Sequence, residues 1–247
     1  MAGVGNEQDG GGPGRRPFVF AHRGAWFDRR NRQNSLEAFA DALDLGVDIE
    51  SDVRLSADRV PVLVHDAVVW YAFVPLVVGW LPARWLRRFG IPSLDDLYRT
   101  LGHDYELSLD LKVVRAAEPA IEVARRWEAI DRLWLVHDDL LVLDRVRTAD
   151  RDVRLVHENR LADLDRIGVE PEAHLRALAE HHVQAANTSW RRWTPELLAA
   201  ARSAGVLAFG SLIGHPDHMD RALAVGLDGI YADHIEAILA ALPEDDR

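Results

Sequence analysis

The sequence contains no cysteine among its 247 residues. This absence excludes disulfides, thiolate metal sites and cysteine nucleophiles, so any bound metal must be held by oxygen or imidazole ligands. Basic residues are also outnumbered by acidic ones, 29 to 40, which gives a formal net charge of −11 at pH 7. A chain this acidic is a poor nucleic-acid binder, since neutralising backbone phosphates requires clustered basic side chains. We therefore expect no nucleic-acid partner.

Long hydrophobic runs are lacking as well. The most apolar stretch, residues 67–82, carries no charged side chain. It is shorter than the roughly 18 residues expected of a membrane-spanning helix, and Pro75 and Gly79 interrupt it. The glycine-rich residues 1–17 contain no apolar signal-peptide core. The sequence therefore predicts a disordered leader over residues 1–17 and a cytoplasmic protein.

From Phe18 onward, short runs rich in Val, Ile and Leu alternate with longer segments of helical spacing. Eight strands followed by helical patterns predict an α/β protein, a (β/α)8 TIM barrel forming one domain over residues 18–247. An open doubly wound sheet is the alternative, but no Gly-x-Gly-x-x-Gly motif follows the first strand. The candidate strands are residues 18–23, 48–54, 106–113, 132–137, 153–157, 183–187, 206–213 and 229–232.

Helix signals support this alternation. Ser35 precedes an apolar-periodic run and can cap its free N–H groups, while Thr194 and Pro195 supply a cap and a first-turn proline. Gly205 stands where a left-handed residue would end a helix. The predicted helices are residues 35–45, 93–101, 118–127, 171–181, 195–203 and 216–225.

A short apolar insertion, at about residues 67–90, follows the second strand and its continuation at residues 60–65. Its uncharged part, residues 67–82, has two interpretations. It could grip a lipid chain or make peripheral contact with a membrane surface. It could equally form a lid packed on the barrel, which we favour because aromatic and aliphatic runs usually become buried.

Polar residues stand at the ends of the predicted strands, where barrel enzymes place their functional groups. Glu50 and Asp52 are two apart in one strand and share a face, as do Asp110 and Lys112 in the next. Three inward carboxylates repel one another unless a cation lies between them. An all-oxygen set of this kind suits Mg²⁺ or Ca²⁺.

Lys112 is the only lysine in the chain, whereas the other 28 of the 29 basic residues (29 − 1) are arginine. A compact ammonium differs from a guanidinium fork, and beside the carboxylates it could hold a phosphate oxygen. His22 and His65 end separate strands and could exchange protons with an attacking and a leaving oxygen. Arg23 could neutralise the non-bridging oxygens. Four further strand-end residues could line the substrate pocket or have a structural role: His137, Asp138, His157 and Glu158.

Several ordered motifs resemble the glycerophosphodiester phosphodiesterase family, whose signature is His-Arg, a Glu-x-Asp pair and a later His. The similarity continues to the last strand and covers almost the whole chain after the leader. The matching segments are AHRG at 21–24, NSLEAF at 34–39, GVDIESDV at 46–53, VHD at 64–66, IPSL at 91–94, LDLK at 109–112 and GLDGIYAD at 226–233.

The resemblance implies a barrel enzyme that hydrolyses glycerophosphodiesters to an alcohol and glycerol 3-phosphate with the help of a divalent cation. Position by position, it implies metal ligands, an acid–base pair and phosphate-binding groups. These are, respectively, Glu50, Asp52 and Asp110; His22 and His65; and Arg23 and Lys112.

Two positions depart from the family pattern. Gln33 replaces the usual glutamate before the first helix, and Asp110 replaces a glutamate, as in the related spider-venom-type phospholipases D. Two alternatives stay open: the apolar insertion allows a lysophospholipase D-like enzyme acting on lipids, and the Gln33 and Asp110 departures allow a non-catalytic barrel that binds phosphodiesters. The sequence also leaves open the alcohol, the metal, the oligomeric state, and the choice between a cyclic phosphate and direct attack by water.

Overall fold

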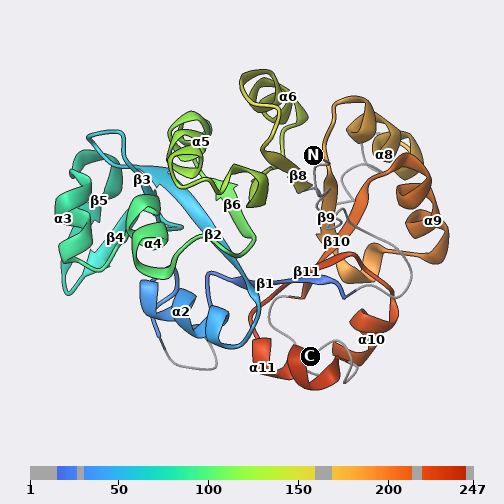
Figure 1. Ribbon diagram of the computed structural model, residues 1–247, viewed down its shortest axis with the longest axis horizontal. Coiled ribbons are helices and arrows are strands. Elements are labelled where there is room, and N and C mark those ends of the chain that lie inside the picture. Colours follow the sequence, from blue (N-terminus) through green and yellow to red (C-terminus); the bar gives the residue numbers. More distant parts are fainter. Residues whose placement is uncertain (1–15, 27–30, 159–168, 213–218, 243–247) are drawn as a thin grey trace, which may run out of the picture.

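The computed structural model describes residues 16–26, 31–158, 169–212 and 219–242, so most of the expected leader lies outside the described residues. Its main sheet has the order β1-β11-β10-β9-β8-β7-β6-β2-β3, and β1 also pairs with β2 to close the ring. Strand β3 is antiparallel to β2, and the other eight strands pair in parallel. Helices surround this ring (Figure 1). The predicted (β/α)8 barrel is confirmed.

All eight predicted barrel strands are present, with ends that shift by a few residues. They are β1 (Phe18–His22), β2 (Asp48–Leu55), β6 (Leu107–Leu111), β7 (Leu133–His137), β8 (Arg154–Glu158), β9 (Ala185–Ser189), β10 (Leu207–Leu212) and β11 (Gly229–Ala232).

The outer layer contains the predicted helices and some that periodicity did not reveal. Those not predicted are α3 (Ala83–Arg88), α6 (Leu140–Ala149) and α11 (Ile235–Ala241). With six and seven residues, α3 and α11 are too short to display a clear helical repeat. The others are α2 (Leu36–Asp44), α4 (Leu94–Leu101), α5 (Ala117–Arg126), α8 (Pro171–Glu180), α9 (Pro195–Ala204) and α10 (Met219–Ala224).

The caps form as the sequence indicates. The Ser35 hydroxyl accepts a hydrogen bond from the N–H of Ala38 at 3.2 Å and fixes the start of α2. The Thr194 hydroxyl accepts from the N–H of Leu197 at 3.2 Å, one turn into α9. Gly205 ends α9 with a φ of 71°.

An aromatic cluster fills the barrel interior beneath the carboxyl ends of the strands. The rings of Phe20 and Tyr231 stack at 5.1 Å, and those of Trp134 and Phe209 lie 5.4 Å apart. A Cβ on Gly229 would lie only 2.5 Å from the Phe209 ring, so glycine permits this close packing. The cluster forms the floor beneath the open end of the barrel.

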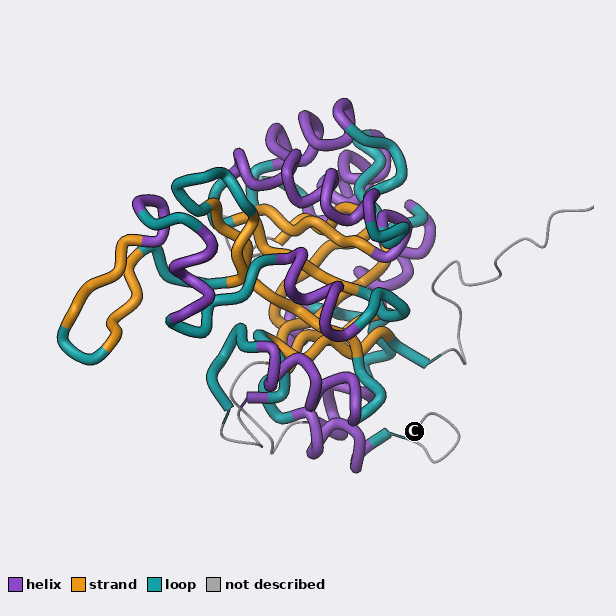
Figure 2. The backbone as a smooth tube through the Cα atoms, turned by 60° about the vertical axis from the view of Figure 1, so that its left-hand side comes forward, coloured by secondary structure: helices purple, strands orange, loops and turns teal. Residues whose placement is uncertain are grey.

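The insertion after β2 begins with β3 (Pro61–Leu63), paired with β2, and continues as a hairpin of β4 (Val68–Tyr71) and β5 (Val74–Val77). A 3₁₀ turn, η1 (Val78–Trp80), then leads into α3. The hairpin projects from the body of the molecule (Figure 2). None of the described helices is long and apolar enough to cross a bilayer.

The expected packing of this insertion is confirmed for only part of it. Leu76 is buried, and Val78 is buried in a small cluster that also contains Leu86. In contrast, Phe73 is 95% exposed and Trp80 is 80% exposed. The hairpin extends beyond the body of the molecule (Figure 2), and Phe73 lies in the turn at its tip, whereas Trp80 lies in the 3₁₀ turn that follows the hairpin.

Candidate active site

The register of three neighbouring strands brings the predicted site residues together. Strand β1 pairs with β2 so that His22 lies beside Glu50, and β2 pairs with β6 so that Asp52 lies beside Asp110. A pocket of ≈300 Å³ opens there. Its wall includes every predicted site residue except His65: it is lined by His22, Arg23, Glu50, Asp52, Asp110, Lys112, Val136, Glu158, Asn187, Ser211 and Tyr231.

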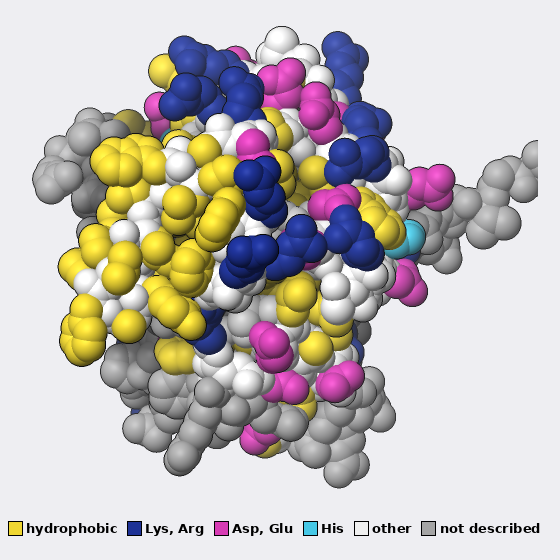
Figure 3. Space-filling view, turned by 90° about the vertical axis from the view of Figure 1, so that its left-hand side faces the viewer, with side chains coloured by type: hydrophobic (Ala, Val, Ile, Leu, Met, Phe, Trp, Pro, Cys, Tyr) yellow, Lys and Arg dark blue, Asp and Glu magenta, His cyan; other side chains and the backbone are white. Residues whose placement is uncertain are grey.

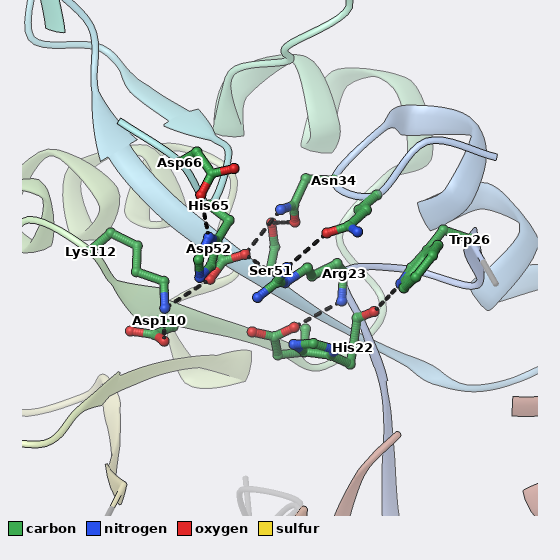
Figure 4. A network of polar contacts seen from close by, with 12 residues as sticks. His22, Arg23, Trp26, Asn34, Ser51, Asp52, His65, Asp66, Asp110 and Lys112 are labelled. Atoms are coloured by element: carbon green, nitrogen blue, oxygen red, sulfur yellow. Dashed lines mark hydrogen bonds and ion pairs between the residues drawn. The ribbon is translucent and has the colours of Figure 1, made fainter. Parts of the chain in front are cut away.

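Two cations hold the carboxylates on one side of this pocket. Lys112 Nζ lies 2.6 Å from Asp110 Oδ2 and 3.2 Å from Asp52 Oδ1. Arg23 Nε lies 3.1 Å from the other Asp52 oxygen (Figure 4). Burial lowers the pKa of Lys112, but the negative charges of Asp110 and Asp52 outweigh it and raise that pKa. Lys112 is therefore a permanent cation in this pocket.

A second layer of hydrogen bonds orients Asp52 and Arg23. Asn34 Nδ2 donates to Asp52 Oδ2 at 3.0 Å, and Ser51 Oγ donates to Asn34 Oδ1 at 2.7 Å. Gln33, at the first departure from the family pattern, accepts a bond from Arg23 Nη1 at 2.8 Å. A neutral amide oxygen therefore serves here as the acceptor for the guanidinium.

The loop that carries these groups has an uncommon backbone. Arg23 and Asn34 adopt φ values of 60° and 56°, in the left-handed region that residues other than glycine seldom occupy. The N–H of Asn34 donates to the carbonyl of Arg23 at 3.0 Å, which links the two ends of the loop. Backbone strain of this kind is characteristic of functional sites, where the surrounding structure holds it in place.

Glu50 is the most perturbed carboxyl in the pocket. It is buried, and its Oε2 accepts a hydrogen bond from the backbone N–H of Arg23 at 2.8 Å. Burial raises the pKa of Glu50 to about 8, and repulsion by Asp52 and Asp110 adds to the rise, while His22 and the Arg23 N–H oppose it. Burial and the neighbouring carboxylates therefore both favour the protonated form of Glu50 when no cation is bound.

The three neighbouring carboxyl groups of this pocket are the expected metal ligands. Among the described residues, no three His, Asp or Glu side chains already converge as a metal-binding group. Glu50, Asp52 and Asp110 nevertheless line one pocket, and their mutual repulsion raises the pKa of Glu50. A divalent cation would relieve that repulsion, and an all-oxygen donor set matches Mg²⁺ or Ca²⁺. The residues present therefore fit the expected metal in their chemistry.

His22 is held by a partner from the far end of the chain. Its Nδ1 lies 2.7 Å from Asp233 Oδ1, and its carbonyl accepts a bond from Trp26 Nε1. Burial lowers the pKa of His22, but the charge of Glu50 and the bond to Asp233 raise it more strongly, so the pKa lies above its ordinary value. With Nδ1 engaged, Nε2 is the nitrogen left for exchange with a substrate.

His65 occupies a different environment. Its side chain is 39% exposed, and its Nδ1 lies 2.8 Å from Asp66 Oδ1. It does not line the pocket, although Figure 4 shows it on the side where Asp52 lies. Arg54 Nε donates to the His65 carbonyl at 2.7 Å and anchors its backbone. A catalytic role for His65 remains a prediction.

The opposite wall was not assigned from the sequence. Asn187 lies 3.4 Å from Glu158 and accepts a hydrogen bond from Ser211 Oγ at 3.2 Å. Of the histidine and acidic residues left open between lining and structure, only Glu158 reaches the pocket. His157 is buried against the ring of His174, and burial together with the charge of His174 lowers the pKa of His157 to about 4.

Comparisons with known proteins point to one enzyme family. The sequence profile of the glycerophosphoryl diester phosphodiesterase family matches residues 22–74. "Probable glycerophosphodiester phosphodiesterase 2" of Mycobacterium tuberculosis is 34% identical over 128 residues, which cover 47% of this chain and 46% of that protein. A glycerophosphodiester phosphodiesterase of Caldanaerobacter subterraneus is 25% identical, over 90% of this chain and 96% of its own. Together these comparisons indicate the glycerophosphodiester phosphodiesterase family.

Solved structures of similar proteins share the barrel fold of this chain. The glycerophosphodiester phosphodiesterase of Thermotoga maritima superposes with a TM-score of 0.78 at 19% identity, over 92% of this chain and 99% of its own. A phosphodiesterase of Oleispira antarctica, solved with its product sn-glycerol-3-phosphate, superposes with a TM-score of 0.75 at 19% identity, over 91% and 96% of the two chains. At these identities the likeness shows the shared fold.

Proposed function

We propose that this chain hydrolyses glycerophosphodiesters to an alcohol and glycerol 3-phosphate, with a divalent cation and histidine acid–base catalysis. The observation that carries the proposal is the pocket in which His22, Lys112 and three carboxylates meet. The names of the relatives, and the product bound to the Oleispira antarctica enzyme, support the same substrate class. The catalytic unit proposed is one domain over residues 18–247, preceded by the leader, in a cytoplasmic protein.

The metal would be Mg²⁺ or Ca²⁺, held by Glu50, Asp52 and Asp110. When bound, it would polarise the phosphate and offset the negative charge that grows in the transition state. Lys112 and Arg23 would contribute further positive charge, since both already lie beside the carboxylates. Preorganised cations of this kind stabilise developing charge without having to reorganise during the reaction.

His22 would exchange the proton of the reacting oxygen through Nε2. As a general base it would remove a proton from the attacking oxygen while a new P–O bond forms. The ester P–O bond then breaks, and a general acid returns a proton to the departing alkoxide. His65 is proposed as the partner in this exchange. The hydrogen bond to Asp233 would keep the His22 ring in the required orientation and tautomer.

The wall formed by Asn187, Ser211 and Tyr231 would face the glycerol portion of the substrate. These side chains are polar and uncharged, as is appropriate for recognising hydroxyl groups. A lysophospholipid is the second candidate substrate, and the specific observation in its favour is the exposed apolar hairpin that follows His65. That hairpin is also where we propose peripheral membrane contact, through residues 67–82.

The test is turnover of glycerophosphocholine, glycerophosphoethanolamine and a lysophospholipid, with Mg²⁺, with Ca²⁺ and with chelator. We expect chelator-sensitive turnover that His22→Ala abolishes. His181→Ala is the matched control, because His181 lies at the end of α8 and pairs with Asp144. A folded protein that binds metal but turns over none of these diesters would instead favour the non-catalytic barrel.

A further inference from the structure

The β4–β5 hairpin exposes large apolar side chains where it projects from the body of the molecule. Trp70 is 67% exposed on β4, and Phe73, in the turn between the strands, is 95% exposed. Trp80 and Trp85 extend the same apolar surface toward α3, and Arg88 stacks over the Trp85 ring at 5.0 Å. Figure 3 shows apolar side chains gathered over one side of this face, with basic side chains beside them.

A second cavity lies at the foot of this hairpin, apart from the pocket of the candidate active site. It has a volume of ≈400 Å³ and is bordered by the first and last residues of the hairpin segment, Ala67 and Val77. Three arginines line it, Arg54, Arg59 and Arg115, and no acidic side chain does. Trp80 forms part of the same wall, so the cavity and the apolar surface are continuous.

The charge of this region contrasts with that of the whole chain. Residues 67–90 contain three arginines and no acidic residue, although the chain carries a net charge of −11. Within the part of the chain that the structure describes, neither Arg59 nor Arg115 has a carboxylate partner. Two acidic side chains that precede the hairpin are engaged elsewhere: Asp58 accepts from the Ala83 N–H and from Ser56, and Asp66 pairs with His65.

Resting on the membrane contact in the proposed function, we propose that the chain's partner is an anionic lipid bilayer, which docks on this hairpin and on the arginine-lined cavity together. The aromatic side chains of the tip enter the membrane interface, where Trp and Tyr are favoured. Arg59 and Arg115 bind the phosphate of an anionic headgroup in the cavity, as guanidinium groups do in bidentate fashion. The cavity lies close to the candidate active site, because Val113 in the cavity wall directly follows Lys112 in the pocket wall.

The shape of the surface favours a bilayer over a second copy of the chain. A stable protein interface needs roughly 800 Å² of matched surface on each partner. The hairpin is a projecting finger of two four-residue strands whose apolar side chains surround a narrow tip. A projecting hairpin can insert its tip into the membrane interface, and the arginines of the cavity at its base then contact the lipid headgroups.

The test is co-sedimentation of the full chain with phosphatidylcholine vesicles, with and without phosphatidylglycerol. We expect binding at least about tenfold tighter to the anionic vesicles, weakened by added salt. Trp70→Ser with Phe73→Ser should weaken this binding about tenfold. Arg59→Gln with Arg115→Gln should weaken it about 25-fold, at about fivefold for each arginine.

Two matched controls lie elsewhere on the surface. Leu141→Ser removes a side chain that is 67% exposed on α6, and Arg176→Gln removes an exposed arginine of α8; neither should change vesicle binding. Turnover of soluble glycerophosphocholine and the thermal midpoint should remain unchanged in all of these variants. This readout separates a failure of docking from a failure of the proposed activity.

Three results would overturn the docking site. The first is equal binding, or no binding, to neutral and anionic vesicles. The second is a dimer in light scattering that Phe73→Ser dissociates without any vesicle binding, which would make a second copy the occupant. The third is binding of inorganic phosphate that Arg59→Gln and Arg115→Gln abolish while vesicles are ignored, which would assign the cavity to a soluble anion.

Discussion

The two walls of the pocket differ in almost every property. The wall from β1, β2 and β6 is charged, and each carboxylate in it touches a cation or an N–H group. The wall from β9, β10 and β11 consists of neutral groups: Ser211 donates to Asn187 at 3.2 Å, and the Tyr231 hydroxyl lies 2.9 Å from Ser108 Oγ. We infer that the first wall performs the chemistry and that the second fits the substrate.

The strongest test of this division is Lys112→Met. The change removes a cation that lies 2.6 Å from Asp110 and leaves two carboxylates without their shared partner. We expect kcat for glycerophosphocholine to fall about 10³-fold, as when a preorganised charge-stabilising group is lost. Lys112→Arg, which keeps the charge but changes its shape, should recover only part of the activity.

Circular dichroism must show both variants folded. A Lys112→Met enzyme that loses affinity but keeps kcat would assign Lys112 to substrate binding, and the contrast between the two walls would disappear.

The next effect in size is expected for Asp233→Asn. Asp233 touches His22 rather than the substrate, so we regard it as a positioning residue. An amide can present the wrong partner to Nδ1 and favour the wrong tautomer. We expect kcat to fall about 10²-fold with little change in KM.

Asp66→Asn is the matched control, because Asp66 makes the corresponding contact with His65 but is exposed. Equal losses in the two variants would show that the two histidines are equally dependent on their carboxylates. A change in KM alone for Asp233→Asn would contradict the positioning role.

The neutral wall should respond differently. Asn187 is buried and accepts a bond from Ser211, so Asn187→Leu removes a polar group that faces the pocket. We expect KM for soluble diesters to rise about tenfold while kcat changes less. Steady-state kinetics beside Ser211→Ala, which should have the smaller effect, would measure this. A loss confined to kcat would mean that this wall also takes part in the chemistry.

The sequence predicts the charged wall better than the neutral one for a physical reason. Strand residues alternate between faces, so Glu50 and Asp52, two apart, had to share a side, and parallel register brought Asp110 beside them. The Asp233 contact joins residues 211 positions apart, and nothing local in the sequence indicates it. The exposure of Phe73 could not be predicted either, because the sequence of an apolar run does not show whether another part of the protein packs against it.

The smallest effect on activity is expected just behind the neutral wall, at His157→Gln. His157 is buried, and its folded-state pKa of about 4 lies below the ordinary value of 6.5 because of burial and His174. The neutral form is therefore favoured in the folded protein, and its contribution to stability is present above pH 6.5 and lost as the pH falls toward 4. The loss amounts to at most about 3 kcal/mol.

We expect urea unfolding of the wild type to show a steeper loss of stability between pH 7 and pH 4 than that of His157→Gln, with turnover at pH 7 nearly equal. Parallel curves would show that His157 does not titrate with unfolding, and lost turnover would extend the catalytic wall behind Glu158.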